Sequence, residues 1–140
     1  MIEKIFVNLP VADLERAKRF YAAIGFTINE QFTDEAAAAV SVNDAINVML
    51  LTHAKFAEFS PLPIADAGAA TAVLNCLSVA SREAVDAIIA KAGAAGGKTG
   101  WRAPQDHGFM YGEGFQDPDG HVWEIMWIDE AAMAGDGVAA

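Results

Sequence analysis

The chain repeats itself, and this repeat limits its possible folds more than any other feature of the sequence. Shifting the sequence by 68 residues lays residues 11–25 over residues 79–93. Each segment begins near a good helix N-cap, Asp13 or Ser81, with a glutamate two positions later, where negative charge suits the helix dipole. The repeat therefore predicts the same structural unit twice.

The residues that follow these N-caps have the apolar spacing of a helix lying on a sheet. The apolar positions are Leu14, Ala17, Tyr21 and Ile24 in the first copy and Val85, Ile88, Ile89 and Ala92 in the second. Gly25 and Gly93 follow, and glycine at such a place is typical of a left-handed C-cap. We predict two short amphipathic helices, each ending at its glycine.

Segments with β-strand character surround each helix. They cover residues 4–11, 27–32, 37–42 and 46–52 in the first copy and 72–79, 97–102, 109–116 and 121–128 in the second. The sequence Asp-Pro-Asp-Gly at 117–120 favours a type I turn, which would join the last two strands as a hairpin. The predicted order of elements is therefore βαβββ in each of the two copies.

These elements predict one domain of the α+β class over residues 1–140. Its two modules cover 3–52 and 72–128, and a linker at 53–71 joins them. The linker contains a possible helical turn, and the alanine- and glycine-rich end, 131–140, is expected to be a loosely held tail.

Charge and composition exclude several classes of partner. The 140 residues include nine Lys and Arg against 19 Asp and Glu, a formal net charge of −10. Nucleic acids and anionic membranes need clustered basic side chains, so we expect neither as a partner. The start does not resemble a signal peptide, and no apolar run approaches the roughly 18 residues of a membrane span. We expect a cytoplasmic protein, and the single Cys76 agrees with a reducing compartment.

The tandem repeat and two local signatures resemble the vicinal oxygen chelate (VOC) superfamily. The signatures are Val-Ala-Asp-Leu-Glu-Arg at 11–16 and Phe-Gln-Asp-Pro-Asp-Gly-His-Val-Trp-Glu at 115–124. That superfamily includes glyoxalase I, extradiol dioxygenases and bleomycin resistance proteins. Residues 6–21, 48–56 and 104–129 are similar to its glyoxalase-like branch, the predicted lactoylglutathione lyases. The resemblance implies curved mixed sheets around a concave groove, helices on the convex side, and a homodimer.

In metal-dependent members of the superfamily, the first and last strands of each module hold a divalent ion. Carried over to this chain, the four ligand positions fall on Phe6, Leu50, Leu74 and Glu124. Only Glu124 offers a donor atom, whereas divalent metal centres need three or more oxygen or nitrogen donors. We therefore expect the usual metal site to be lost and no cofactor to be bound. A replacement site built from His53, His107 and Glu124 stays open, although no ligand spacing supports it.

Strand alternation extends these positions to a predicted groove floor. Its members would be Phe6, Asn8, Leu50, Leu74, Cys76 and Glu124. Mainly apolar walls with a few polar groups are typical of a small-molecule site. The simpler interpretation is that Phe6, Leu50 and Leu74 pack on one another as core.

Three residues are candidates for catalysis. Glu124 lies in an apolar strand and could act as a general base or acid, or it could be a remnant of the ligand position held by Arg102. His107 and Tyr111 belong to a polar, glycine-containing stretch and could serve as proton shuttle and hydrogen-bond donor. The simpler interpretation is an ordinary polar loop with His107 in water.

The remaining notable side chains favour structural roles. Cys76 is expected to be a small buried hydrophobe, because no base can be placed beside it. His53 and His121 are expected at the surface or at an edge. The three tryptophans, Trp101, Trp123 and Trp127, are expected in the core or in a dimer interface.

Two functions of different classes follow from these features. The first is a metal-independent protein that binds a small organic molecule in its groove, of the resistance or sequestration type. The second is an isomerase or lyase of the lactoylglutathione lyase type, acting on a small carbonyl or thioester substrate with Glu124 as base. A domain with a collapsed groove and a purely structural role is a third possibility.

Overall fold

The computed structural model describes residues 1–132, so nearly all of the tail predicted at 131–140 lies outside the described residues. The first module runs β1 (Ile5–Val11), α1 (Leu14–Ala23), β2 (Thr27–Asn29), the 3₁₀ turn η1 (Glu30–Phe32), β3 (Ala37–Ser41) and β4 (Ile46–Thr52). After α2 (His53–Phe59), the second runs β5 (Leu74–Ser78), α3 (Arg82–Ala94), β6 (Lys98–Thr99), β7 (Gln105–Asp106), β8 (Met110–Gln116) and β9 (Val122–Ile128).

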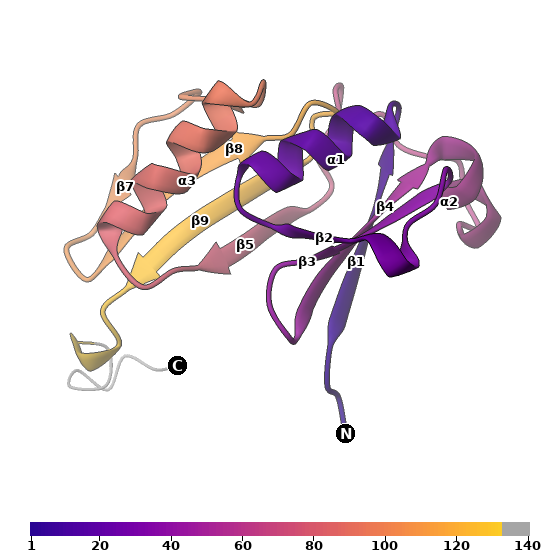
Figure 1. Ribbon diagram of the computed structural model, residues 1–140. Helices are drawn as coiled ribbons and strands as arrows, with labels where there is room; N and C mark the ends of the chain where they lie inside the picture. The colour runs from indigo at the N-terminus through magenta and orange to yellow at the C-terminus, as the bar shows by residue number, and fades with distance from the viewer. Residues whose placement is uncertain (133–140) are drawn as a thin grey trace.

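Each module forms its own mixed sheet, which confirms the α+β class. The first module has the predicted βαβββ order, and the second has it with one additional short strand, β7. The strand orders are β1-β4-β3-β2 and β5-β9-β8-β6, with β7 also paired to β8. In both sheets the first strand runs parallel to the last, β1 with β4 and β5 with β9, and the other pairs are antiparallel. Helices α1 and α3 lie on the same side of the molecule, above the sheets (Figure 1).

The predicted helix starts are confirmed, and one predicted helix end is wrong. Asp13 accepts a hydrogen bond from the Arg16 amide at 3.1 Å, and Ser81 accepts one from the Ala84 amide at 3.1 Å. Gly25 follows α1 with a φ of +106°, as expected of a left-handed cap. Helix α3 instead continues through Gly93, and Gly96, with a φ of +101°, takes that role. The alanines after Gly93 are good helix formers, so the second helix extends to the next glycine.

A buried hydrogen-bond network joins the two modules. The turn predicted at 117–120 is present, and the Gly120 amide donates to the Asp117 carbonyl at 3.0 Å. The buried Asp117 carboxylate accepts from the Tyr21 hydroxyl at 2.6 Å, and the Trp123 indole donates to the Tyr21 oxygen at 3.0 Å. Burial and Asp117 raise the pKa of Tyr21 well above its ordinary value, so the phenol keeps its proton. Helix α1 is thereby fixed to the hairpin of the other module.

The two faces of each sheet have different surroundings. Strand register places Val48 and Leu50 beside Val7 and Leu9, on the side that packs against α1. In the second sheet Phe115, Trp123 and Ile125 occupy the equivalent helix side and are buried. The opposite side, here called the open face, carries Phe6, Asn8 and Met49 on the first sheet and Leu74, Cys76 and Glu124 on the second.

Within residues 1–132, no helix has the length and apolar character needed to cross a membrane.

Candidate functional site

The open face of the first sheet is apolar, with polar amides and the charged side chain of Lys4 at its border. Phe6 is 55% exposed on β1, and the neighbouring Met49 on β4 pairs in register with Asn8. Together with Phe32 of η1, Phe6 and Met49 line a hollow of about 440 Å³. At the other end of this face α2 packs on the sheet, and Leu51 is buried there.

Leu50 was predicted for the groove floor, and that placement is wrong. Its side chain is 0% exposed and belongs to the core under α1. Strand β4 is apolar at almost every position, so sequence alone could not fix which residues face which side. Register with β1 shows that Met49 takes the position expected for Leu50. Phe6 and Leu74 therefore do not form a common core with Leu50.

On the second sheet, the open face presents Leu74, Cys76 and Glu124 in one area. Leu74 is 59% exposed, and Cys76 is exposed rather than buried as predicted. Cys76 lies beside Glu124 in the parallel pairing of β5 with β9. Partial burial, followed by the charge of Glu124, raises the pKa of the Cys76 thiol. The thiol is thus accessible but not activated as a nucleophile.

Glu124 is held in an ion pair. A terminal nitrogen of Arg102, Nη2, lies 2.6 Å from Glu124 Oε1, and both side chains are half-buried. The other terminal nitrogen, Arg102 Nη1, is shielded from solvent and has no partner in the described chain. This arrangement matches the expectation that Arg102 holds the carboxylate, and the two charges cancel on this face.

Trp101 covers the open face next to this pair. A Cβ built on Gly114 would lie 2.8 Å from an indole carbon of Trp101, so the ring rests directly on the backbone of β8. Gly114 pairs in register with Glu124, and Trp101 is 46% exposed. Only glycine permits such a close approach. Trp101 was expected in the core or in a dimer interface, and the core placement is wrong because its ring lies exposed above the sheet.

The other two candidate catalytic residues do not meet Glu124. Tyr111 alternates with Gly112 and Gly114 along β8, so it faces the helix side. His107 is exposed in the turn before β8, and its amide donates to the Met110 carbonyl at 2.8 Å. Met110 is four residues from Gly114, about 13 Å along a strand. The predicted constellation of Glu124, His107 and Tyr111 is therefore not assembled.

Tyr111 instead belongs to a polar cluster around α3. Its hydroxyl donates to Asp86 Oδ1 at 2.6 Å, and this hydrogen bond raises the pKa of the phenol. The Arg82 guanidinium stacks over the Tyr111 ring and bonds Asp106 through both terminal nitrogens, at 2.8 and 2.9 Å. That pairing holds the pKa of Asp106 well below its usual range. These contacts fasten α3 and the β7–β8 turn to the sheet.

The side chains at the expected metal positions do not fit a divalent ion. Phe6, Met49 and Leu74 have no suitable donor atom, and the Glu124 carboxylate is engaged by Arg102. Over residues 1–132, no group of three or more His, Cys, Asp and Glu side chains is placed to hold a metal ion. His53, His107 and Glu124 are accordingly not assembled as a replacement site.

Two members of the open face, Met49 and Trp101, were missed as site residues. The Met49 position needed the register of β4. A signal for Trp101 was present, since the alternating glycines of Gly112-Glu113-Gly114 in a strand often mark a close approach of another group. His121 was expected at an edge, but its ring is half-buried between the modules.

Comparison with known proteins supports the fold over most of the chain. Residues 4–43 match the family described as bleomycin resistance protein-like N-terminal. A hypothetical protein from S. aureus is 29% identical, with a TM-score of 0.75 over 91% of this chain and 94% of that one. A glyoxalase/bleomycin resistance protein/dioxygenase family enzyme from Burkholderia phytofirmans PsJN is 22% identical, with a TM-score of 0.71 over 88% and 96%.

A third similar structure is TnmS3, an antibiotic binding protein from Streptomyces sp. CB03234. It is 22% identical, with a TM-score of 0.62 over 91% of this chain and 97% of that one. A search of curated proteins finds no significant match. The repeated βαβββ module, the N-terminal match and the shared structure show that this chain has the glyoxalase/bleomycin resistance protein fold, and they support the resemblance to the vicinal oxygen chelate superfamily.

Proposed function

We propose that this protein binds a neutral, mainly apolar small molecule on its open face and that binding needs no divalent metal. One observation carries the proposal: the positions where a metal ligand would be expected hold apolar side chains, and the only carboxylate among them is paired with Arg102 at 2.6 Å. A ligand bound there would contact Phe6, Met49 and Leu74 rather than an ion.

The charge on the open face supports a neutral ligand. The chain carries a net charge of −10, yet Glu124 and Arg102 neutralise each other. Burying an unpaired ionic group of a ligand against this surface would cost more free energy than burying a neutral one. The exposed indole of Trp101 beside the pair favours a ligand with a flat conjugated ring, which can stack on it.

The relatives support binding as the role. The match to the bleomycin resistance protein-like family and the similarity to an antibiotic binding protein support binding of an organic molecule, whereas the Burkholderia relative is called an enzyme. We extend this role to the present chain as a proposal of sequestration, with the ligand's chemical class taken from the open face.

Titration with Nile red, a neutral conjugated dye, tests the proposal. We expect the protein to bind the dye with the same Kd before and after extensive dialysis against EDTA. We expect Phe6→Ala to weaken binding at least tenfold, because the exposed ring is one of the large apolar side chains that line the hollow. Phe109→Ala is the matched control, since Phe109 is also an exposed phenylalanine but lies in the β7–β8 turn. Loss of binding after EDTA and recovery with Mn²⁺, or a Phe6→Ala protein that binds like the parent, would overturn the proposal.

The enzymatic alternative, an isomerase or lyase with Glu124 as base, has weaker support. Glu124 is already bonded to a guanidinium, and neither His107 nor Tyr111 lies beside it. Turnover of any member of a panel of small carbonyl and thioester substrates, abolished by Glu124→Gln, would favour this alternative.

We further infer that a second copy of the chain covers the exposed edges of the two sheets. β1 and β5 are edge strands, and Ile5 on β1 is an exposed apolar side chain on the face opposite to Phe6. Unpaired apolar edges are normally protected, and a two-fold copy would bring the same surface to both partners. We expect light scattering to give twice the chain mass of 14.8 kDa and Ile5→Lys to give the monomer. A monomeric parent protein would contradict the inference.

A further inference from the structure

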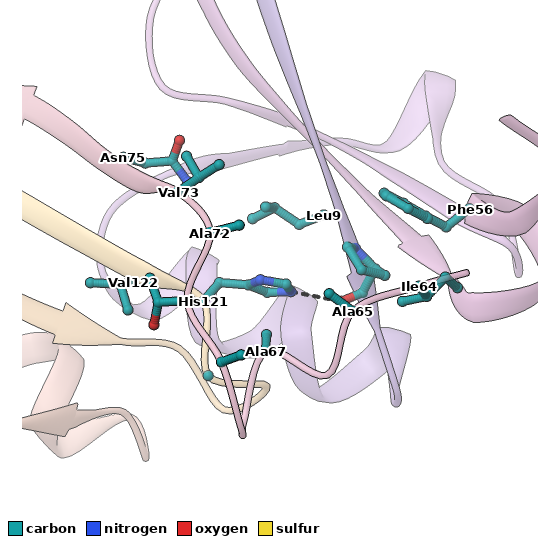
Figure 2. Close-up of a pocket in the computed structure, with 14 residues that line it drawn as sticks. Leu9, Phe56, Ile64, Ala65, Ala67, Ala72, Val73, Asn75, His121 and Val122 are labelled. Atoms are coloured by element: carbon teal, nitrogen blue, oxygen red, sulfur yellow. Dashed lines mark hydrogen bonds between the residues drawn. The ribbon is translucent and has the colours of Figure 1, made fainter. Parts of the chain in front are cut away.

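A separate pocket lies at the seam between the two modules, under the connecting segment that follows α2 (Figure 2). The end of β1 and the start of β9 form its floor, and residues 64–73 pass across it. This seam pocket has a volume of about 210 Å³. It shares none of its lining with Phe6, Met49, Cys76 or Glu124 of the open face.

The lining of the seam pocket contains no carboxylate, ammonium or guanidinium group. Of the 14 residues around it, none is Asp, Glu, Lys or Arg, although the chain has 28 such residues in all. Small and branched apolar side chains dominate, among them Leu9, Ile64, Ala67, Ala72 and Val73. An ionic group would lose its hydration in this pocket without gaining a counter-charge, so the pocket selects against charged ligands.

Two polar groups in the lining, the His121 ring and the Asn75 carboxamide, can fix the orientation of a ligand by hydrogen bonding. The His121 ring nitrogen Nε2 lies 2.7 Å from the Pro10 carbonyl oxygen, which can only accept, so Nε2 carries the proton. In the neutral ring the other nitrogen, Nδ1, is then an acceptor. Asn75 adds a carboxamide at the rim, and no hydrogen bond among the lining residues reaches it (Figure 2). A ligand with one N–H or O–H group therefore finds acceptors in an otherwise apolar pocket.

The segment above the pocket is held mainly by packing. In the described part of the chain, the hydrogen bonds of residues 61–73 join them to one another or to Ser60. Few hydrogen bonds to either module would have to break for this segment to move aside, so a ligand has a low-cost route of entry.

We propose that the seam pocket is a second binding site, for a small neutral aromatic molecule that carries one hydrogen-bond donor. A cavity of about 150 Å³ is enough to hold benzene. The seam pocket is somewhat larger, which fits a molecule of one or two rings. The donor group bonds to His121 Nδ1 or to the Asn75 carboxamide, and the rings contact the alanine, valine and isoleucine side chains. This site is independent of the ligand proposed for the open face.

The experiment uses indole as the probe and the full chain labelled with ¹³C at the alanine methyl groups. Ala67 and Ala72 line the seam pocket, whereas Ala39 pairs with Met49 on the open face and serves as the internal control. We expect indole to shift the methyl signals of Ala67 and Ala72 in a saturable manner. Because indole is also a flat conjugated ring, any shift of Ala39 reports binding on the open face and should follow a separate saturation curve. We expect 1-methylindole, which lacks the donor, to bind at least tenfold more weakly.

Two variants separate this site from the open face. Ala72→Leu fills the pocket and should abolish the indole-dependent shifts, and Asn75→Leu, which keeps the side-chain size, should weaken them. Phe6→Ala should leave them unchanged, even if it abolishes dye binding on the open face. Absence of a saturable shift of Ala67 and Ala72 in the parent protein, or an Ala67 shift that Ala72→Leu leaves unchanged, would overturn the proposal. The comparison of the two indoles needs no variant, so a folding defect in Ala72→Leu would not leave the proposal undecided.

Discussion

The two faces of the same strands serve different purposes in this protein. On the helix side, Leu50, Phe115 and Trp123 are almost completely buried and pack into one core that both modules share. On the open face, Phe6 of β1 and Leu74 of β5, on strands that pair with β4 and β9, are more than half exposed. The fold therefore draws its stability from one face of its sheets and keeps the other available for binding.

The largest expected effect tests this contrast at two adjacent residues of β4. Leu50→Ala should lower the free energy of unfolding by about 2–5 kcal/mol, because it opens a cavity in a closed core. Met49→Ala, on the open face, should lower it by about 1 kcal/mol or less. Urea denaturation of both variants measures the difference. Equal losses would mean that the two faces are not distinct in packing.

A second test addresses the buried network between the modules. Asp117→Ala leaves the Tyr21 hydroxyl and the amides of Asp119 and His121 without their acceptor, and should cost about 2–3 kcal/mol. Asp44→Ala is the control, because Asp44 is an exposed carboxylate in a turn. Thermal unfolding should show a clear loss of stability only for Asp117→Ala, while dye binding on the open face survives at low temperature.

The same aspartate should give a smaller, pH-dependent effect. Burial raises the pKa of Asp117 above its ordinary value, so the folded state holds the proton more tightly than the unfolded state. Asp117 therefore contributes most to the free energy of unfolding below about pH 4, near its pKa in the unfolded chain. This contribution is lost as the pH rises through the pKa of Asp117 in the folded protein. Asp117→Asn does not titrate. The difference in unfolding free energy between variant and parent should therefore shift in favour of the variant as the pH rises from about 4; a difference independent of pH would contradict this account.

The smallest expected effect concerns Tyr111, which the sequence suggested as a groove residue. Tyr111→Phe removes the hydrogen bond to Asp86 but keeps the ring under Arg82, so stability should change by about 0.5 kcal/mol or less. Dye binding should be unchanged because Tyr111 faces the helix side. Weaker dye binding in this variant would place Tyr111 in the binding site and blur the contrast between the two faces.

Local signals in the sequence were sufficient for most of the fold. Side-chain caps at Asp13 and Ser81 and the turn at 117–120 depend on a few neighbouring residues, and all three are present. The end of α3 was mistaken because Gly93 can continue a helix when good helix formers follow it. Both Gly93 and Gly96 are suitable residues to end the helix, and the sequence pattern does not distinguish between them.

The site was less accessible to prediction. Phe6, Asn8, Leu74, Cys76 and Glu124 lie on the predicted face, because β1 and β5 stand at a fixed distance before the caps Asp13 and Ser81 and the hairpin fixes β9. β4 is apolar on both faces, so a displacement of one residue put Leu50 where Met49 stands. The position of Trp101 over Gly114 involves residues 13 positions apart, and the seam pocket involves β1 and β9, more than 100 positions apart.

By itself the sequence determined the repeated module, the caps and turns that delimit it, and the apolar character of the expected metal positions. These depend on short-range geometry and on residue type, which a single chain displays directly. Only the tertiary structure decided which side of β4 faces the groove, that Arg102 neutralises Glu124, and that the two modules enclose a second pocket at their seam. Those features arise from register and from packing between distant segments, where the free energy depends on contacts that no local pattern contains.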